Sequence, residues 1–309
     1  MVVQHKQPIA EDVVALRLKT IGGSSLPPWT AGAHVDLHLP GGKVRQYSLC
    51  GDPADRHGYD LAVLREPEGR GGSAFIHDQL QIGDTLAISP PRNNFALVPA
   101  TRYLFIVGGI GITPILPMIN EADRLGTPWT LHYGGRTAAG MAFTETLATC
   151  GDRVNLVTED TSGFLDLDRI LTASAPGTLV YACGPEGLLQ ALDSLTDRLP
   201  PGAIHTERFR AAPAAEPASS AAELTVHCAK SGIEVTVEPD HSILESLERA
   251  GIAVASSCRD GICGTCETSV LDGVPDHRDS VLSTAERNAG NRMLICVSRA
   301  VTGHLTLDI

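Results

Sequence analysis

Short apolar runs separated by glycine and proline make up the first 100 residues. The runs fall at 34–42, 44–51, 60–67 and 84–91. Strands this short, with turns this frequent, are typical of antiparallel barrels and sandwiches. The pattern therefore predicts an antiparallel β-barrel domain over residues 1–100.

The pattern changes after residue 100, where apolar strands alternate with stretches of helical periodicity. Strands are predicted at 102–109, 129–135, 154–160 and 178–185. Helices are predicted at 114–126, 141–151 and 186–199. Strands that alternate with helices form parallel sheets, because each helix carries the chain back to the start of the next strand. We therefore expect an α/β domain with a parallel sheet over residues 101–210.

A third unit follows a segment that lacks apolar periodicity. Residues 211–223 are rich in Ala, Pro, Ser and Glu, a composition typical of a semi-extended linker. Beyond it, residues 224–309 begin with a predicted hairpin that turns at Ser231–Gly232. A helix then starts after Asp240 or Ser242, and Ser242 with Glu245 fits a capping box.

Four cysteines of this third unit have a diagnostic spacing. They are Cys258, Cys263, Cys266 and Cys296. The pattern C-x4-C-x2-C followed by a distant cysteine is that of plant-type ferredoxins, whose four thiolates hold a 2Fe–2S cluster. Gly261 and Gly264 allow the loop to wrap closely around a cluster, because they lack Cβ and accept a positive φ. The sequence therefore predicts a 2Fe–2S cluster.

The alternative interpretation of these cysteines is a zinc site or four unlinked thiols. Zinc sites usually contain two C-x2-C pairs, and only one is present here. The remaining cysteines are Cys50, Cys150, Cys183 and Cys228. We interpret Cys50, Cys150 and Cys228 as small buried hydrophobic residues. Cys183 is the exception, because it belongs to a candidate ligand-binding segment described below. A 2Fe–2S cluster accepts one electron, so another group in the chain is expected to collect electrons in pairs.

A glycine-rich turn follows the predicted strand at 102–109. Its sequence, Gly108–Pro114, brings backbone N–H groups and a helix N-terminus together, as pyrophosphate sites require. The turn departs from G-x-G-x-x-G because Pro114 stands where that fingerprint has glycine, although proline suits a first helical turn. Cys183–Pro185 follows a later strand, at the edge where parallel sheets bind ligands. An ordinary αβ turn is the alternative for that segment.

Charge and hydropathy narrow the classes of partner. The net charge of −12 argues against nucleic acid, which needs a basic face. No apolar run reaches the roughly 20 residues that span a bilayer, and the N-terminus lacks the regions of a signal peptide. We therefore expect a cytoplasmic protein with no membrane partner. A monomer is a further expectation. In that reducing compartment the eight cysteines are expected to be ligands or buried thiols rather than disulfides.

Together these motifs and their order resemble the ferredoxin–NADP⁺ reductase superfamily. They resemble more closely the reductase components of Rieske oxygenases, such as phthalate dioxygenase reductase and vanillate O-demethylase reductase. The resemblance covers the whole chain and implies a flavin barrel, a nicotinamide domain and an α+β ferredoxin-like (β-grasp) domain. It implies an NADH:acceptor oxidoreductase that passes electrons through FMN and a 2Fe–2S cluster to a separate oxygenase, for example an aromatic O-demethylase. Because the cofactors do the chemistry, no catalytic side chain is expected.

The resemblance implies a flavin site in two short segments. Its residues are Arg45, Tyr47, Ser48, Gly71, Gly72 and Ser73. Tyr47 and Ser48 are expected to contact the isoalloxazine, with Ser48 near N5, while Arg45 faces the phosphate. Ser73 is also interpreted as a simple helix N-cap. Family members of this short type use FMN, and the sequence has no convincing extra segment for an adenine, so we expect FMN rather than FAD.

The resemblance also implies a nicotinamide-dinucleotide site. Its residues are Gly109, Gly111, Thr113, Arg136, Cys183, Gly184 and Pro185. Thr113 is expected near the pyrophosphate and Cys183–Pro185 by the nicotinamide. Arg136 follows the strand that meets the adenosine ribose, but one arginine does not establish a 2′-phosphate site, and the resemblance favours NADH. Phe209 resembles the aromatic residue that covers the flavin, with a core phenylalanine as the alternative.

Two other functions remain open at this stage. In the first, the electron acceptor is a haem or di-iron monooxygenase instead of a Rieske oxygenase. The chain has no C-x-H Rieske segment or haem-ligand motif of its own, so the acceptor is expected to be a separate protein in either case. The second is a non-enzymatic iron–sulfur sensor or scaffold, against which the flavin segment 45–48 argues. Residues 224–309 contain twelve Asp and Glu against seven Lys and Arg, so acidic docking onto a basic oxygenase patch is a further hypothesis.

Overall fold

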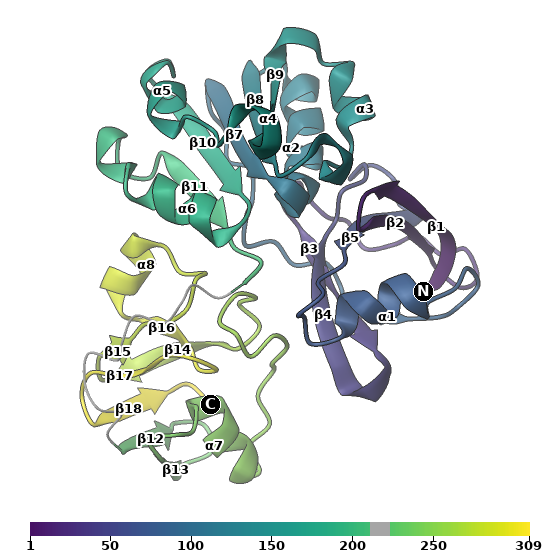
Figure 1. Ribbon diagram of the computed structural model, residues 1–309. Helices are drawn as coiled ribbons and strands as arrows, with labels where there is room; N and C mark the ends of the chain where they lie inside the picture. Colours follow the sequence, from purple (N-terminus) through teal and green to yellow (C-terminus); the bar gives the residue numbers. More distant parts are fainter. Residues whose placement is uncertain (211–222) are drawn as a thin grey trace. The chain divides into compact units, whose positions relative to one another are not determined.

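A computed structural model describes residues 1–210 and 223–309 (Figure 1). The described chain forms two compact units, Met1–Glu207 and Arg208–Ile309. The predicted linker, residues 211–223, lies outside the described residues except for its last position.

The first unit begins with two three-stranded antiparallel sheets. One has the order β1-β2-β5 and the other β4-β3-β6. They share one core, to which Leu16, Val35 and Leu61 contribute fully buried side chains. This arrangement confirms the antiparallel fold predicted for the flavin domain. The strands and the accompanying helix are β1 (Val2–Ala10), β2 (Val13–Lys19), β3 (His34–Leu39), β4 (Lys43–Ser48), β5 (Gly58–Leu64), α1 (Gly72–Asp78) and β6 (Ala87–Ile88).

The same unit continues with a five-stranded parallel sheet of order β11-β10-β7-β8-β9. Alternate residues of β7 point to opposite faces, so Phe105 packs against α2 while Ile106 packs against α5 and α6. The strands are β7 (Arg102–Gly108), β8 (Trp129–Gly135), β9 (Val154–Thr158), β10 (Thr178–Cys183) and β11 (Ile204–Glu207). The helices are α2 (Ile112–Leu125), α3 (Thr144–Ala148), α4 (Glu159–Ser162), α5 (Leu167–Thr172) and α6 (Glu186–Asp193).

The strand order places a topological switch point between β7 and β10. From central β7 the chain moves outward through β8 and β9, then crosses to β10 and continues outward to β11. Open parallel sheets bind ligands at such a point, beyond the carboxyl ends of the strands.

Several predicted elements are shorter than expected. The helix predicted at 141–151 covers Thr144–Ala148, because Phe143 before it has a left-handed φ of 62° and Thr149 caps its C-terminus. The helix predicted at 186–199 ends at Asp193. The strand predicted at 84–91 is reduced to Ala87–Ile88, since prolines at 90 and 91 cannot donate to a sheet.

The second unit is a mixed five-stranded sheet of order β13-β12-β18-β14-β16, in which β12 and β18 are parallel. The predicted hairpin at Ser231–Gly232 is confirmed, and so is the capping box, because Ser242 Oγ accepts a hydrogen bond from the Glu245 amide at 3.1 Å. Its elements are β12 (Leu224–Cys228), β13 (Ile233–Val237), α7 (Ile243–Arg249), β14 (Glu267–Asp272), β15 (Pro275–Asp276), α8 (Thr284–Ala289), β16 (Arg292–Leu294), β17 (Arg299–Ala300) and β18 (His304–Leu307).

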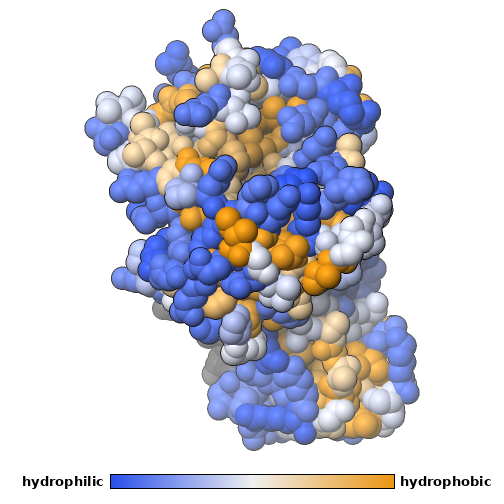
Figure 2. Space-filling model, turned by 90° about the vertical axis from the view of Figure 1, so that its right-hand side faces the viewer, coloured by the Kyte–Doolittle hydropathy of each residue, from blue (hydrophilic) through white to orange (hydrophobic). Residues whose placement is uncertain are grey.

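The surface is largely polar. Figure 2 shows one face on which hydrophilic residues surround smaller groups of hydrophobic ones. Within residues 1–210 and 223–309, no helix has both the length and the apolar character needed to cross a membrane.

Candidate functional site

Strand β4 carries three of the predicted flavin residues. Arg45 and Tyr47 are two residues apart and therefore share one face of the strand. Ser48, at the end of β4, is 5% exposed. Burial raises the pKa of Tyr47 to about 12, so its hydroxyl is a neutral donor at ordinary pH.

Two glycines at the start of α1 lie directly against basic side chains. A Cβ on Gly72 would stand 2.5 Å from Cγ of Arg45, and a Cβ on Gly71 would stand 3.1 Å from Nζ of Lys43. The Arg45 guanidinium also donates to the Arg70 carbonyl at 3.1 Å. Bare backbone next to two cations suits the oxygens of a phosphate, so these residues fit a flavin phosphate. Lys43 was missed in the sequence, although its spacing of two from Arg45 signals a shared strand face.

Ser73 has a different role from the predicted N-cap. The residue before α1 is Gly71, which has a left-handed φ of 79° and makes no side-chain cap. Ser73 lies inside the helix, where its Oγ accepts a hydrogen bond from the Glu66 amide at 3.0 Å. The N-cap interpretation of Ser73 is therefore wrong. The side chain instead closes the loop between β5 and α1, and its hydroxyl hydrogen can still be donated.

The glycine-rich turn and the Cys183–Pro185 segment meet at the switch point. A Cβ on Gly111 would lie 2.5 Å from the carbonyl carbon of Cys183, and a Cβ on Gly108 would lie 2.5 Å from Cδ of Pro185. Only glycine permits this approach of two backbones. The structure thus brings together the two segments that the sequence placed at separate strand ends, at the edge of the sheet where a dinucleotide is expected.

Thr113 lies in the first turn of α2 and is 2% exposed. Its Oγ1 donates to the Ile110 carbonyl at 3.0 Å, so its hydroxyl hydrogen is already used within the turn. Gly109, with a left-handed φ of 52°, directs the turn from β7 into that helix. The Thr113 side chain therefore stabilises the turn. Contact between Thr113 and a pyrophosphate would be made by its backbone N–H group.

Glu207 is a candidate that the sequence analysis missed. It ends β11 and lies opposite Cys183 in the parallel pair β10–β11. Its Oε2 is buried and has no hydrogen-bond partner among the described residues. The sequence offered one indication of this role: Glu207 lies in the segment His205–Phe209 (HTERF), which closes the nucleotide domain.

Arg136 and Phe209 both have exposed side chains. Arg136 is exposed directly after β8, and its carbonyl accepts a hydrogen bond from the Asp160 amide at 3.2 Å. Phe209 belongs to the second unit and is 37% exposed, so its interpretation as a core phenylalanine is wrong.

The four predicted cluster ligands gather in the second unit. Cys263, Cys266 and Cys296 are buried, while Cys258 is partly exposed. Backbone N–H groups point at the sulfurs: Asp260 donates to Cys258 at 3.3 Å and Thr265 to Cys263 at 3.4 Å. Hydrogen bonds from the thiols of Cys263 and Cys296 lower the pKa of Cys258, with backbone amides adding to the effect. Backbone N–H groups directed at the sulfurs stabilise negative charge there, which suits an iron–sulfur cluster.

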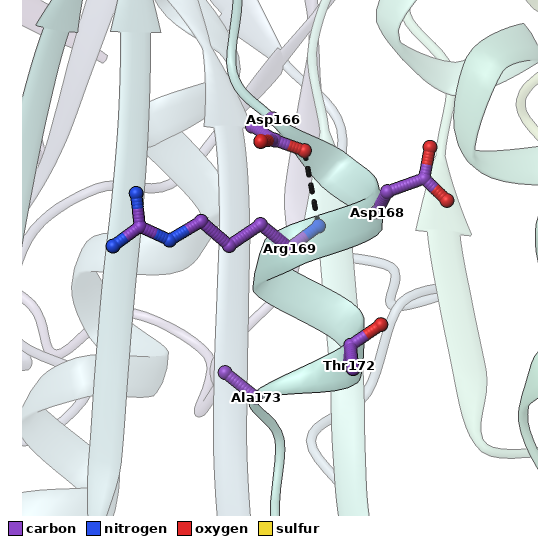
Figure 3. A pocket seen from close by; sticks show the side chains of 5 residues that line it. All are labelled: Asp166, Asp168, Arg169, Thr172 and Ala173. Carbon is purple, nitrogen blue, oxygen red and sulfur yellow. Dashed lines mark hydrogen bonds between the residues drawn. The ribbon is translucent and has the colours of Figure 1, made fainter.

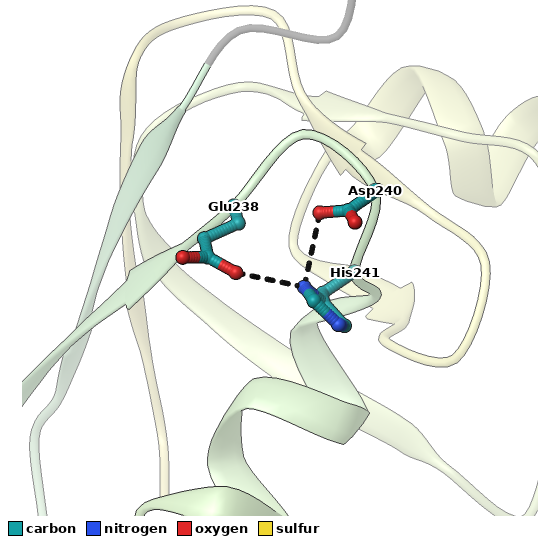
Figure 4. Close-up of side chains that lie close together, drawn as sticks. All are labelled: Glu238, Asp240 and His241. Atoms are coloured by element: carbon teal, nitrogen blue, oxygen red, sulfur yellow. Dashed lines mark ion pairs between the residues drawn. The ribbon is translucent and has the colours of Figure 1, made fainter.

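Two other polar groups lie apart from these sites. Figure 3 shows a surface depression around α5, lined by Asp166, Asp168, Arg169, Thr172 and Ala173. Asp166 there accepts a hydrogen bond from the Arg169 amide at 3.0 Å, which is an ordinary helix cap. In Figure 4, His241 Nδ1 lies 3.0 Å from Glu238 and 3.1 Å from Asp240, an ion-paired turn before α7.

Known proteins match both ends of the chain and its whole length. Residues 1–97 match the family described as oxidoreductase FAD-binding domain, and residues 226–301 match the 2Fe-2S iron-sulfur cluster binding domain. The phenoxybenzoate dioxygenase subunit beta of Ectopseudomonas oleovorans is 46% identical over 97% of this chain and 94% of its own. The vanillate O-demethylase oxidoreductase of a Pseudomonas species is 39% identical over 100% and 99%.

Solved structures agree with these relatives. Phthalate dioxygenase reductase, described as a modular structure for electron transfer from pyridine nucleotides to [2Fe-2S], is 35% identical with a TM-score of 0.71 over 100% of this chain and 97% of its own. An intact type IV self-sufficient cytochrome P450 monooxygenase is 42% identical with a TM-score of 0.94, but this chain spans 40% of it. The chain belongs to the phthalate dioxygenase reductase family of Rieske oxygenase reductases, which join a flavin-binding electron-transfer module to a C-terminal plant-type 2Fe–2S domain.

Proposed function

We propose that this chain oxidises NADH and delivers the electrons singly to a separate Rieske-type oxygenase. The observation that carries the proposal is the set of four cysteines, with backbone N–H groups directed at their sulfurs, in one chain with a glycine-rich turn packed against Cys183–Pro185 at the switch point of a parallel sheet. A cluster alone only stores one electron, whereas a dinucleotide bound at this turn would supply electron pairs. A sensor or scaffold would need no such dinucleotide site.

Each cofactor has a proposed set of residues. Flavin is held by Arg45, Tyr47, Ser48, Gly71, Gly72 and Ser73, with Lys43 added from the structure. NADH is held by Gly109, Gly111, Thr113, Arg136, Cys183, Gly184 and Pro185, and Phe209 covers the flavin. The cluster is bound by Cys258, Cys263, Cys266 and Cys296. When bound, flavin accepts a hydride and releases its electrons one at a time, which a one-electron cluster requires. The protein positions these groups and tunes their potentials.

FMN is proposed over FAD, although the family matched at residues 1–97 is described as FAD-binding. Lys43 and Arg45 flank the bare backbone of Gly71 and Gly72. Two cations suit the dianionic terminal phosphate of FMN better than the singly charged diester phosphates of FAD. Flavin released by heat and compared chromatographically with both standards decides between them.

NADH is proposed over NADPH on the charges near Arg136. Glu159 and Asp160 are exposed directly after β9, and the Asp160 amide is bonded to the Arg136 carbonyl. Carboxylates at this edge repel the 2′-phosphate of NADPH and offset the attraction of one arginine.

The organisation of the chain is part of the proposal. Residues 1–100 form the flavin domain, 101–210 the NAD domain, 211–223 the linker and 224–309 the ferredoxin domain. We propose a monomer of the cytoplasm, where a reducing environment keeps the cysteines available as ligands.

The acceptor is proposed to be a Rieske mono- or dioxygenase, such as an aromatic O-demethylase. Relatives named for phenoxybenzoate dioxygenase and vanillate O-demethylase support this choice. A haem monooxygenase is the second candidate, favoured by the similarity to a self-sufficient cytochrome P450. The acidic ferredoxin domain is proposed to dock on a basic patch, so raising the ionic strength should slow electron delivery.

Anaerobic titration with NADH tests the proposal directly. Both the flavin and the cluster absorption should bleach, and an electron paramagnetic resonance signal of a reduced 2Fe–2S cluster should appear. Bleaching of the flavin without reduction of the cluster would contradict the proposed electron route. NADH-driven turnover with a purified Rieske oxygenase, compared with turnover with a purified cytochrome P450, separates the two acceptors.

A further inference from the structure

One phenylalanine in the first unit is almost fully exposed. Phe164 follows α4 and is 82% exposed, the largest fraction among the large hydrophobic side chains of the described residues. A single exposed apolar residue needs no explanation in itself. The position of Phe164 on the sheet and the conformation of its backbone indicate a binding role.

The neighbour of Phe164 fixes its position on the sheet. Leu165 packs on Gly134, whose Cβ would stand 3.3 Å from Cγ and Cδ1 of Leu165. Gly134 in turn pairs with Gly108 in the β7–β8 register. The loop after α4 therefore folds back over the carboxyl ends of β8 and β7, next to the glycine-rich turn.

A glycine directs Phe164 outward. Gly163 has φ 74° and ψ −162°, a conformation that is open almost only to glycine. It turns the chain so that Leu165 is partly buried while Phe164 is exposed. The backbone conformation of Gly163 therefore exposes the side chain of Phe164.

The order of the strands indicates which part of a bound dinucleotide lies near Phe164. On the proposed function, the nicotinamide lies by Cys183 at the end of β10, and the pyrophosphate lies at the turn after β7. Sheet order continues to β8 and β9, so the adenosine half of the dinucleotide must extend toward the edge where Phe164 and Arg136 lie. Aromatic rings bind nucleobases by stacking, whichever base is present.

We propose that Phe164 is the platform on which the adenine ring of the dinucleotide stacks. The inference rests on the proposed NADH oxidation and names a residue that positions the substrate remote from the hydride. A contact to the adenine is equally strong before and during hydride transfer. It therefore lowers KM and leaves kcat unchanged.

A comparison of two substrates tests the role. Phe164→Ala should raise KM for NADH about tenfold, the loss expected when one base–aromatic stack is removed. KM for reduced nicotinamide mononucleotide, which lacks adenosine, should not change. Phe164→Tyr should restore NADH binding, and calorimetry with NAD⁺ should show the same loss for the alanine variant. Leu156→Ala, at an apolar position of β9 that is 42% exposed, is the matched control.

Three other results of these experiments would overturn the inference. Equal rises for both substrates would indicate a structural effect, and no rise for either would remove Phe164 from the site. Slower cytochrome c reduction with unchanged flavin reduction would make Phe164 a contact for a protein partner instead. Failure of the proposed function is distinguishable, because the wild-type flavin would then not be reduced by NADH at all.

Discussion

Cys183 and Glu207 lie opposite each other at the carboxyl ends of β10 and β11. Burial raises the pKa of Glu207 to about 8. Burial also raises the pKa of the Cys183 thiol well above its ordinary value, and the nearby Glu207 carboxylate adds to the shift. Both groups are therefore neutral near pH 7. The negatively charged dinucleotide proposed to bind at these strand ends therefore meets no buried anion there.

The protonated Glu207 should make stability depend on pH. Its carboxyl ionises near pH 4.5 in the unfolded chain and near pH 8 in the folded one, so the folded state holds the extra proton in between. The stabilising contribution is complete below pH 4.5 and is lost as pH rises through 8. Between pH 5 and 8 the Tm of the wild type should fall more than that of Glu207→Gln. Glu145→Gln, at an exposed position, should follow the wild type, and three parallel curves would contradict the assignment.

The backbone contact of Gly111 with Cys183 should be needed for NADH binding. Gly111→Ala places a methyl group against the Cys183 carbonyl and must shift the turn. Displacing a bound substrate by about 1 Å costs about a hundredfold in rate, so kcat/KM for NADH should fall by about that factor. Flavin content should be retained, because the proposed flavin residues lie on other segments. Gly187→Ala, in α6 with open space around it, should leave kinetics unchanged. Normal NADH kinetics in Gly111→Ala would refute the contact's importance.

Local patterns in the sequence predicted most of the fold. The alternation of strands and helices predicted the parallel sheet, because burial on both faces leaves runs such as YLFIV. The cysteine spacing and the glycine turn were visible because each depends on residues close together in the chain. Phe143, with its left-handed φ, shortened a helix that apolar periodicity extended too far.

Contacts between segments that are distant in the chain could not be predicted from the sequence. Lys43 meets Gly71 because β4 and the start of α1 lie side by side. Glu207 becomes a buried carboxyl only through its register with Cys183, and Leu165 locates Phe164 only through its packing on Gly134. None of these pairings has a local sequence pattern. The domain boundaries and the roles of the individual site residues stay predictions.

The cluster loop should be sensitive to a side chain at Gly261. Gly261 has φ 70°, and a Cβ there would lie 2.6 Å from Cγ2 of Val297, next to Cys296. Gly261→Ala should therefore open the loop and lower the iron content of the purified protein. Gly232→Ala, with φ 69° and open space, carries the same backbone strain of about 1–2 kcal/mol without the clash. It should lower Tm but keep full iron content. Equal iron loss in both variants would mean that strain alone, not the clash, disturbs the loop.

Removing one proposed ligand should separate the two halves of the electron route. Cys296→Ala should abolish the cluster absorption and cytochrome c reduction, while NADH–ferricyanide activity persists, because flavin can reduce that small oxidant directly. Cys228→Ala, a fully buried thiol of the same core, tests for simple destabilisation. It should lower stability by about 1 kcal/mol through the small cavity it leaves, yet keep the cluster. Cytochrome c reduction that survives in Cys296→Ala would show that electrons leave this protein without passing through the four-cysteine site.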